Sequence, residues 1–417
     1  MSFHRYAVLF GAACAACSPA PAYAQAASPT GALTLDDAFA RALADAPVLN
    51  AAKAAERAAD AAVRQADRGL NPTLDFQLEN ALGTGLYQGL DRTEGTLSFS
   101  QAIERGGDRK ARTELSMRQG ERVKIQTDVS RQDLLMDVEA AYIDVQRAAA
   151  ERLIAEERLA IAREIAATVQ RRVEAARDPL LASSRSLTLV AETEIAVENA
   201  HRSEQAAKER LASFWGGAAA FDVEAASFNL AITSGNTTGA GSPELAAARA
   251  LEKEAHARID VERARAKVDP TVSAGVRYFS DNSEAAFVVG ISIPLGINDN
   301  NSAAVERASA EDQRAHLETE ALRRNLDRQI ATARSQMDIA VGEIRSLDER
   351  LLPTAQEAVE RARQGYNQGG FSYLDVLDAQ RVLSNARMQR ISALSSYHRA
   401  RVALKRLAGE YTAIAAQ

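Results

Sequence analysis

The chain has 417 residues, a formal net charge of −6 at pH 7, 46% hydrophobic residues and only 5% aromatic residues. Its mild acidity, with no basic patch interleaved with aromatic residues, argues against a nucleic-acid-binding protein. Abundant alanine, glutamate and arginine favour long helices over a bulky globular core.

Residues 1–24 are predicted to be a secretory signal peptide. A weakly positive start at His4 and Arg5 precedes an apolar stretch over 6–17, and small residues ending at Ala24 predict cleavage there. No later run of about 18 apolar residues follows, so no transmembrane helix is expected. The exported chain is therefore expected to be periplasmic, secreted or an outer-membrane β-protein.

Both cysteines, Cys14 and Cys17, lie inside this predicted signal. Cleavage after Ala24 therefore leaves a mature chain without disulfides or thiol chemistry. The alternative is a lipoprotein signal in which Cys17 is acylated. It ranks second because Cys14 stands where such signals usually carry an aliphatic residue.

The first half of the mature chain predicts two helices, two strands and a long helical hairpin. Leu74, Phe76 and Leu78 alternate with polar residues, which is the period of a strand with one apolar face. Asn71-Pro72 ends the helix before this strand, and Pro179 breaks the long hairpin at its tip. The expected elements are helices over 38–46 and 47–69, strands over 73–79 and 96–100 in a hairpin of about 73–103, and a helical hairpin of about 108–213.

The first long helix keeps one narrow apolar stripe over much of its length. Apolar residues recur every four and then three positions from Leu134 to Val173, and only Arg152 interrupts them. Such a stripe, here called a seam, is typical of a helix that contacts partner helices all along its length. Roughly 65 residues would span roughly 100 Å, far more than an ordinary globular helix.

The same order of elements repeats in the second half. Pro243 starts a helix as Pro47 does, and Asp269-Pro270 matches Asn71-Pro72. The expected elements are strands over 272–278 and 287–293 in a hairpin of about 271–295, and a hairpin of about 302–408 made of one unbroken helix over 302–364 and a last helix over 372–408. The seam of the unbroken helix is expected to include Leu347, Leu351, Thr354 and Ala358. The mature chain, 25–417, is thus interpreted as one domain built from repeats over 35–217 and 243–410.

The apolar face of the predicted strands has no partner in a chain of rods with narrow seams. For an exported chain, the other apolar phase is the outer membrane, which sheets span only as closed barrels because lipid leaves an open edge unpaired. Four strands cannot close a barrel, so other copies of the chain are expected to complete it. The residues expected to face lipid are Phe76, Phe99, Val276, Phe287, Val289 and Ile291.

Two stretches of sequence resemble a known family. Tyr366 to Gln380 looks like the second periplasmic hairpin turn of the outer-membrane efflux proteins of the TolC type, and Arg172 to Pro179 resembles the first turn. The resemblance covers essentially the whole mature chain. It implies a mainly α fold with a small transmembrane β part, in which a homotrimer forms an α-helical barrel and a twelve-stranded outer-membrane β-barrel.

The resemblance also implies a function. Such a protein is the passive exit duct of a tripartite efflux system, located in the outer membrane and extending into the periplasm. Its partners are a periplasmic adaptor (membrane fusion) protein, an inner-membrane RND-type pump and outer-membrane lipid. Residues 177–181 look most like the cation-efflux branch, which serves cobalt–zinc–cadmium or copper–silver pumps, so divalent heavy-metal cations are the substrates implied. The pump, rather than the duct, mainly selects the substrate.

Asp375 and Asp378 have two compatible interpretations. Acids near a helix start favour the helix dipole, and Ser372 with Asp375 resembles a capping pair. The resemblance implies instead that both acids project into the narrow periplasmic entrance, where rings of carboxylates favour cations.

The family's entrance is also closed by polar links among a tyrosine, an arginine and an acid. Tyr366 is present, but Phe371 and Ala182 occupy the positions aligned with the other two, so closure is expected to depend more on packing and on the two aspartates.

The two hairpin tips are expected to be the adaptor-docking end. The residues singled out there are Ala176, Pro179, Tyr366, Gly369 and Ser372. Each also has a purely local interpretation, since proline breaks a helix and glycine permits a positive φ in a turn.

No motif supports an enzyme, a cofactor or a metal site. The chain has five histidines, but none forms a local pair with ligand spacing, and neither a G-x-S-x-G nor a Walker A motif occurs. The remaining alternative is a soluble periplasmic coiled-coil scaffold or adaptor with a small β-domain. Two long hairpins and a clear duplication favour the duct.

Overall fold

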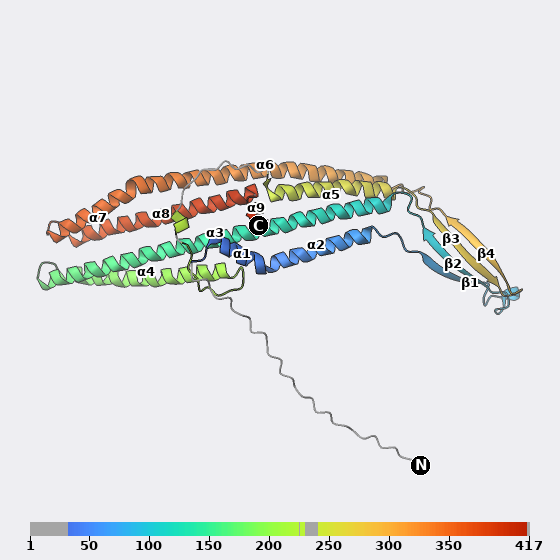
Figure 1. Ribbon diagram of the computed structural model, residues 1–417, viewed down its shortest axis with the longest axis horizontal. Helices are drawn as coiled ribbons and strands as arrows, with labels where there is room; N and C mark the ends of the chain where they lie inside the picture. The colour runs from blue at the N-terminus through green and yellow to red at the C-terminus, as the bar shows by residue number, and fades with distance from the viewer. Residues whose placement is uncertain (1–31, 225, 230–240, 415–417) are drawn as a thin grey trace, which may run out of the picture.

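The computed structural model describes residues 32–224, 226–229 and 241–414. Long helices lie side by side, with a four-stranded sheet at one end of the molecule and two helical hairpin tips at the other (Figure 1). The predicted signal peptide, both cysteines and most of the stretch 233–241 lie outside the described residues. In the part of the chain that is described, no helix is long and apolar enough to cross a membrane.

The two halves have closely similar element orders, and the predicted mainly α fold with four strands is confirmed. The first half consists of α1 (Leu35–Asp45), α2 (Pro47–Ala66), β1 (Thr73–Glu79), β2 (Glu94–Ala102), α3 (Asp108–Glu174) and α4 (Leu180–Ala212). The second half consists of α5 (Pro243–Arg265), β3 (Thr271–Phe279), β4 (Glu284–Ser292), α6 (Ser302–Ser346), α7 (Leu352–Asn367) and α8 (Tyr373–Ala408). Short helical turns lie at Gly85–Tyr87, Ala226–Asn229 and α9 (Tyr411–Ile414).

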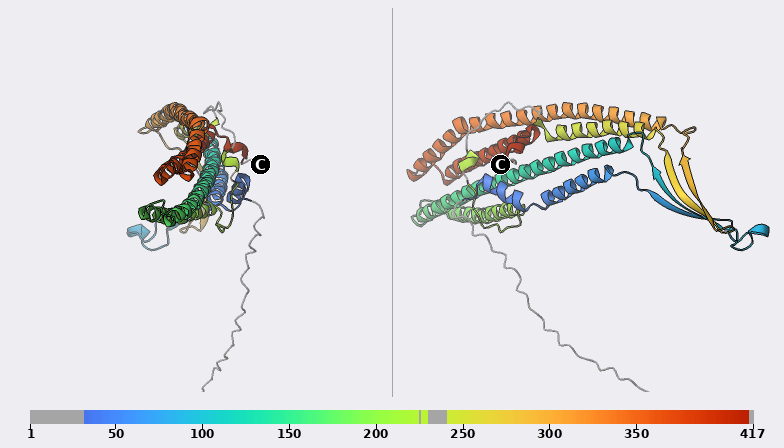
Figure 2. Two further views of the ribbon diagram at one scale, coloured as in Figure 1. Left: turned by 90° about the vertical axis from the view of Figure 1, so that its left-hand side faces the viewer. Right: turned by 45° about the vertical axis from the view of Figure 1, so that its right-hand side comes forward.

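The 67-residue helix α3 is the central rod of the molecule. It contacts α1, α2, α4, α5 and α8, and none of its predicted seam residues is exposed. Arg152, which interrupts the seam, forms ion pairs with Glu156 on its own helix and with Glu204 on α4, whose Oε2 lies 2.5 Å from the Arg152 Nε. Viewed along the long axis, the helices lie on an arc rather than in a compact bundle (Figure 2).

The predicted unbroken helix over 302–364 is wrong at one place. A π-helical turn, Leu347–Leu351, separates α6 from α7, and the Leu352 N–H donates to the carbonyl of Leu347, five residues back. Pro353 lies next to this turn and cannot donate an α-helical hydrogen bond, because it has no N–H. The sequence pattern did not reveal that the helical hydrogen-bond pattern changes here.

The π-helical turn shifts the seam by one residue. Leu351, Thr354 and Ala358, which were predicted to lie in the seam, are exposed. The buried positions of α7 are Ala355, Val359, Ala362 and Tyr366. An extra residue in one turn rotates everything that follows it about the helix axis, so the pattern read from α6 cannot be extended into α7.

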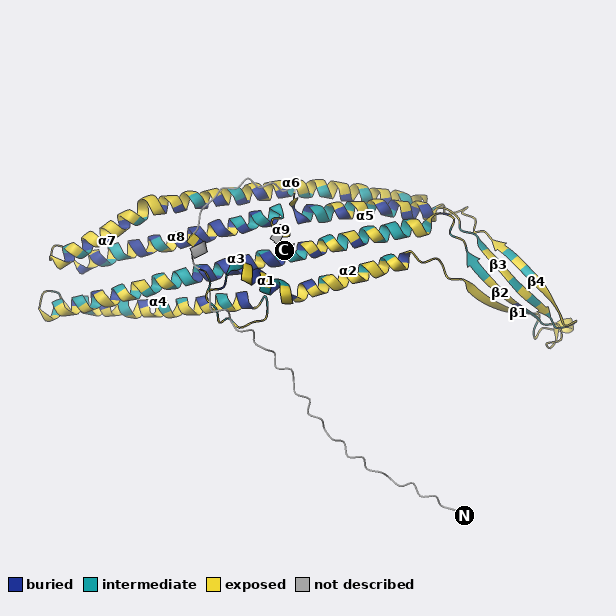
Figure 3. Cartoon of the chain, in the orientation of Figure 1, coloured by how far each residue is buried: buried dark blue, intermediate teal, exposed yellow. Residues whose placement is uncertain are grey.

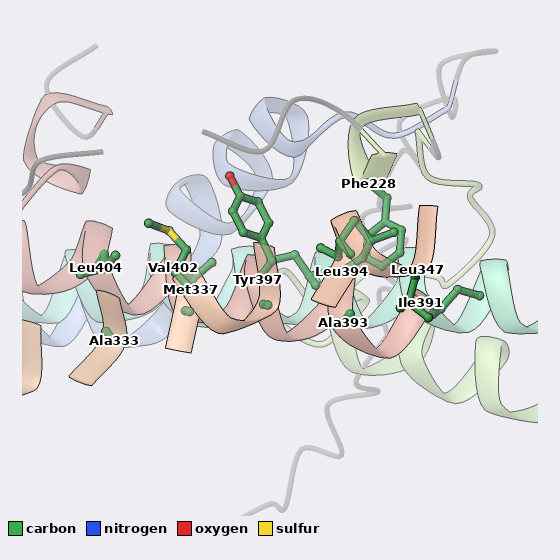
Figure 4. Close-up of a cluster of buried hydrophobic side chains, with 14 of the residues drawn as sticks. Phe228, Ala333, Met337, Leu347, Ile391, Ala393, Leu394, Tyr397, Val402 and Leu404 are labelled. Atoms are coloured by element: carbon green, nitrogen blue, oxygen red, sulfur yellow. The ribbon is translucent and has the colours of Figure 1, made fainter. Parts of the chain in front are cut away.

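A core of buried apolar side chains lies between α6 and α8 (Figure 4). Phe228, from the short turn Ala226–Asn229, packs against α8 beside Leu394 and Tyr397. The ring of His398 stacks on Phe228 at 5.2 Å, and its Nε2 donates to the Phe228 carbonyl at 2.9 Å. The segment between the two halves is therefore fastened to the last long helix by this aromatic pair and its hydrogen bond, and by a hydrogen bond of 2.9 Å from Arg390 to the Asn229 side chain.

The sheet is antiparallel with the order β1-β2-β3-β4, and its outer edges at β1 and β4 have no strand partner within the described chain. The register places Leu74, Phe99, Ala274 and Val289 in one row, and Phe76, Leu97, Val276 and Phe287 in the next row of the same face. This face is exposed, with Phe287 at 91% and Val289 at 76%. The opposite, polar face of β3 is less exposed, so this strand alternates between teal and yellow in Figure 3.

Candidate functional site at the helical tips

The first hairpin tip is a tight turn between α3 and α4. Ala176 has a positive φ of 55°, and the Arg177 N–H donates to the Arg172 carbonyl at 2.8 Å. Pro179 then caps the start of α4 in an extended conformation. The turn thus brings the side chain of Asp178 back over the last turn of α3.

The second tip, between α7 and α8, depends on glycine. Gly369 has a φ of 81°, and the Gly370 N–H donates to the Gly365 carbonyl at 2.8 Å. The ring of Phe371 lies directly on Gly365, where an added Cβ would be only 2.2 Å from the ring. Ser372 is the N-cap of α8 and ends the turn.

One carboxylate joins the two tips. Asp178 accepts a hydrogen bond from the Tyr366 hydroxyl at 2.9 Å, and Arg172 donates to both of its oxygens at 3.0 and 3.2 Å. The Arg172 guanidinium also lies over the Tyr366 ring, 4.5 Å from its centroid, and donates to the Tyr366 carbonyl at 3.1 Å. Bidentate and stacked contacts of this kind need arginine rather than lysine.

These contacts shift the pKa of each partner. The hydrogen bonds from Arg172 lower the pKa of Asp178, and the Tyr366 hydroxyl adds to the effect. Burial, followed by the hydrogen bond to Asp178, raises the pKa of Tyr366 to about 12. The link is therefore made by an ionised aspartate and a neutral tyrosine at neutral pH.

A second tyrosine in the same place has an unpaired hydroxyl. Tyr373 is 6% exposed and lies beside Tyr366, with the ring centroids 6.4 Å apart, and its hydroxyl has no hydrogen-bond partner among the described residues. Burial raises its pKa. Both rings belong to a small apolar cluster that also contains Ile165, Val169, Ala362 and Val376. Buried hydroxyls without partners destabilise the packed state that contains them.

The two predicted entrance acids have different surroundings. Asp375 completes a capping box, because its Oδ2 accepts from the Ser372 N–H at 2.8 Å and from the Ser372 hydroxyl at 2.7 Å. These hydrogen bonds lower the pKa of Asp375. Asp378 is exposed and forms an ion pair of 2.7 Å with Arg381, one turn further along α8. The helix-start interpretation thus describes Asp375 well, whereas Asp378 has no role in capping.

Asp378 also lies on the rim of a groove of about 490 Å³ between α3, α4 and α8. The groove is lined by apolar and polar side chains in nearly equal number, and the charged ones are Arg158, Glu192, Asp378 and Arg381. In the described ranges, no three histidine, cysteine, aspartate or glutamate side chains gather as ligands for a metal ion.

The residues predicted for docking divide into two groups. Ala176, Pro179, Gly369 and Ser372 are exposed at the tips, whereas Tyr366 is 5% exposed and takes part in the link between them. Large apolar side chains that were not predicted to take part in docking are exposed beside the four accessible positions: Leu180, Leu181, Phe371 and Leu374.

Sequence reasoning also missed Arg172 and Asp178 as partners of Tyr366. The acid was sought at Ala182, four residues after Asp178, so a link between tyrosine and an acid was not expected. The structure corrects this expectation, because Asp178 supplies the acid from within the turn. The arginine comes from the first hairpin rather than from the position of Phe371.

Comparison with known proteins gives consistent results. The sequence matches the family described as outer membrane efflux protein over residues 39–217 and 236–410. The cobalt-zinc-cadmium resistance protein CzcC of Cupriavidus metallidurans is 30% identical over 327 residues, which cover 75% of this chain and 77% of that protein. The nickel-cobalt-cadmium resistance protein NccC of Alcaligenes xylosoxydans xylosoxydans is 31% identical over 300 residues, covering 69% of this chain and 68% of that protein.

The fold is similar to that of a solved structure. The outer membrane protein VceC from Vibrio cholerae matches with a TM-score of 0.75 at 20% identity, over 90% of this chain and 96% of that chain.

Proposed function

This chain belongs to the outer membrane efflux protein family, and we propose that three copies of it form one channel that works with a periplasmic adaptor protein and an inner-membrane pump. Membership makes the chain an exit duct of the outer membrane that extends into the periplasm, as the resemblance to TolC-type proteins implied. Three is the number of copies that this resemblance implies.

The observation that carries the proposal is that the apolar face of the sheet is the exposed one. Its apolar face, with Phe76, Phe99 and Phe287, is exposed, and on the two central strands, β2 and β3, the polar face is the more covered one. A sheet whose apolar face is open suits lipid on that face and water on the other. The free edges of β1 and β4 suit pairing with neighbouring copies, which closes the ring of strands. The residues proposed to face lipid are the six predicted from the sequence.

The far end of the rods is the proposed docking site for the adaptor. The tips lie at the opposite end from the sheet (Figure 1), so they reach farthest into the periplasm if the sheet is in the membrane. Leu180, Leu181, Phe371 and Leu374 give this end an exposed apolar surface that a helical partner could cover. The chain itself is a passive conduit without enzymatic activity, and the pump supplies the energy.

The proposed substrates are divalent transition-metal cations. The two relatives compared above are named as resistance proteins for cobalt, zinc, cadmium and nickel. Asp378, which is exposed near the tip, and Asp375 are the residues proposed to line the entrance, where repeated carboxylates favour cations.

Deletion of the gene in its native host tests the substrate class. Growth should become sensitive to zinc, cobalt, cadmium or nickel salts while resistance to an amphipathic drug stays unchanged, and a plasmid copy should restore resistance. Loss of drug resistance alone would overturn the metal assignment. Detergent extraction from the outer membrane followed by mass measurement tests the trimer, which a monomer would exclude.

Site-specific photocrosslinking tests the docking end. A crosslinker at Leu181 should capture the adaptor, whereas one at Leu86, in the loop beyond β1, should not. Both side chains are exposed leucines, so the pair differs in location rather than in chemistry. Capture from Leu86 alone would reverse the orientation proposed here.

A further inference from the structure

An ion-pair network lies on the polar face of the sheet, at the end of the strands farthest from the helices. Arg277 on β3 donates from Nη1 to Glu94 Oε2 on β2 at 3.2 Å, and its Nη2 lies 3.2 Å from Glu79 Oε2 on β1. Its Nε donates to the hydroxyl of Thr96 at 2.9 Å. One guanidinium therefore connects three adjacent strands.

The register explains why a cation is needed at this place. Glu79 and Glu94 are directly opposite each other on β1 and β2, an arrangement in which like charges repel. Arg277 pairs with Thr96, two residues further from the strand ends than Glu94. Its guanidinium reaches both carboxylates across Thr96, which is 7% exposed. The Asn80 amide donates a further hydrogen bond to Glu94 at 3.0 Å. The two glutamates are thus held in place, not left as mobile surface groups.

The outermost row of the polar face carries a third glutamate. Glu284 on β4 pairs in register with Phe279, which pairs with Glu94 and so with Glu79. Arg277 thus compensates one charge of a row with three glutamates. If three copies surround a pore, this row repeats around its outer mouth, where fixed charges act on every passing ion.

We propose that Arg277 is a specificity-determining residue that limits the cation preference of the channel at its outward end. This inference rests on the proposed function, because it requires the polar face of the sheet to line a pore. It is independent of the aspartates near the helical tips, which lie at the other end of the rods.

Planar bilayers with purified full-length protein provide the test. The reversal potential in a potassium chloride gradient is measured for the parent and for Arg277→Gln. The variant should raise the ratio of cation to anion permeability by roughly twofold or more, because it exposes the glutamates to the pore. The increase should shrink at high salt, since the Debye length falls to about 3 Å at 1 M.

Two further variants separate charge from structure. Arg277→Lys keeps the charge but loses the fork, so its selectivity should remain near that of the parent. Selectivity as high as in Arg277→Gln would mean that the strands had rearranged, and would overturn the inference. Glu79→Gln should lower the permeability ratio, and it provides the test if Arg277→Gln does not assemble; an unchanged ratio would overturn the inference.

The controls distinguish the inference from the proposed function. A parent protein that forms no conducting pore contradicts the channel itself. A conducting parent whose selectivity matches that of Arg277→Gln contradicts only the role of Arg277.

Discussion

The Tyr366 hydroxyl donates to Asp178 Oδ2 at 2.9 Å, although the two residues are 188 positions apart in the sequence. The bond joins the tip of the second hairpin to the tip of the first. Tyr373, in the same apolar cluster, has a buried hydroxyl without a hydrogen-bond partner in the described part of the chain. The two tyrosines therefore provide matched tests of how the tips are held together.

Removing each hydroxyl should change the tips in opposite directions. Tyr366→Phe loses a hydrogen bond to a charged group, which is worth about 1.5–3 kcal/mol, and should raise the open probability of the channel in planar bilayers. Tyr373→Phe removes an unpaired buried group and should stabilise the linked arrangement of the tips by about 1–3 kcal/mol, which lowers the open probability. If both variants shift the open probability in the same direction, the link between the tips does not depend on these hydroxyls.

The link between the tips should fail at both pH extremes. The pKa of Asp178 is lowered, so its contribution to stability is complete above its ordinary pKa of about 3.9 and disappears as the pH falls through the lowered value. The pKa of Tyr366 is raised to about 12. The contribution of Tyr366 to stability is therefore complete below its ordinary pKa of about 10, and it disappears as the pH rises through the raised pKa. Conductance should rise in strong acid for the parent but change less for Asp178→Asn. An equal acid response in both would contradict this assignment.

Mild acid should destabilise the packing of His398 against Phe228. Burial lowers the pKa of His398, an effect that the hydrogen bond to Phe228 partly offsets. The nearby charged groups are Glu139, which favours protonation, and Arg401 and Lys405, which oppose it. The folded chain therefore binds this proton less readily than the unfolded chain, and stability should fall as the pH drops below about 6.5.

The matched variant for this prediction is His398→Gln, whose amide can donate a hydrogen bond without titrating. Melting temperatures of the parent and the variant should be measured from about pH 7.5 to about pH 5.5, an interval that brackets the ordinary histidine pKa of about 6.5. The parent should lose more stability than the variant over this interval. Equal losses would show that other groups cause the pH dependence.

Neighbouring valines on β4 test which face of the sheet meets lipid. Val289 lies in the apolar row with Phe99 and Leu74, whereas Val288 lies on the polar face opposite Gly275. Val289→Arg should cost about 2–4 kcal/mol if it lies near the membrane midplane and should reduce the amount of assembled protein in the outer membrane. Val288→Arg should assemble like the parent. Equal assembly of both variants would contradict the proposed orientation of the sheet.

The two acids proposed to line the entrance should make unequal contributions to ion selectivity. Asp378→Asn should lower cation selectivity by roughly twofold and weaken block by divalent cations, because its carboxylate is exposed and does not cap a helix. Asp375→Asn should have a smaller effect, since its carboxylate is engaged by Ser372. Assembly should survive in both variants, because the Ser372 side chain can still cap α8. Parent-like selectivity in the double variant would leave only the helix-start interpretation.

The elements that sequence predicted best are those with a local cause. The alternation of Leu74, Phe76 and Leu78 defined β1 at Thr73–Glu79, and proline residues marked the starts of α2, α4 and α5 correctly or within one residue. The seam of α3 was also predicted, because an uninterrupted α-helix keeps one period. These features need only neighbours within a few positions.

What sequence missed depends on contacts between distant residues or on a change of period. Arg172 and Asp178 gain their roles only when the second hairpin brings Tyr366 beside them, and no local pattern marks such a meeting. Thr354 and Ala358 were placed in the seam because the period of α6 was extended through Pro353. The π-helical turn, in which Leu352 donates to the carbonyl of Leu347 five residues back, makes that extension wrong.

The π-helical turn Leu347–Leu351 also determines how α7 is rotated about its own axis, and so which way Tyr366 points at the tip. Tyr366 follows Val359 and Ala362 on the shifted stripe of α7, so its direction is decided about four helical turns earlier, at about 3.6 residues per turn. Deleting one residue from that turn would shorten the rod by only about 1.5 Å, but it would rotate the rest of α7 by about 100° and carry Tyr366 away from Asp178. The two hairpins are therefore matched in angle as well as in length, and a single added residue in one of them keeps that match.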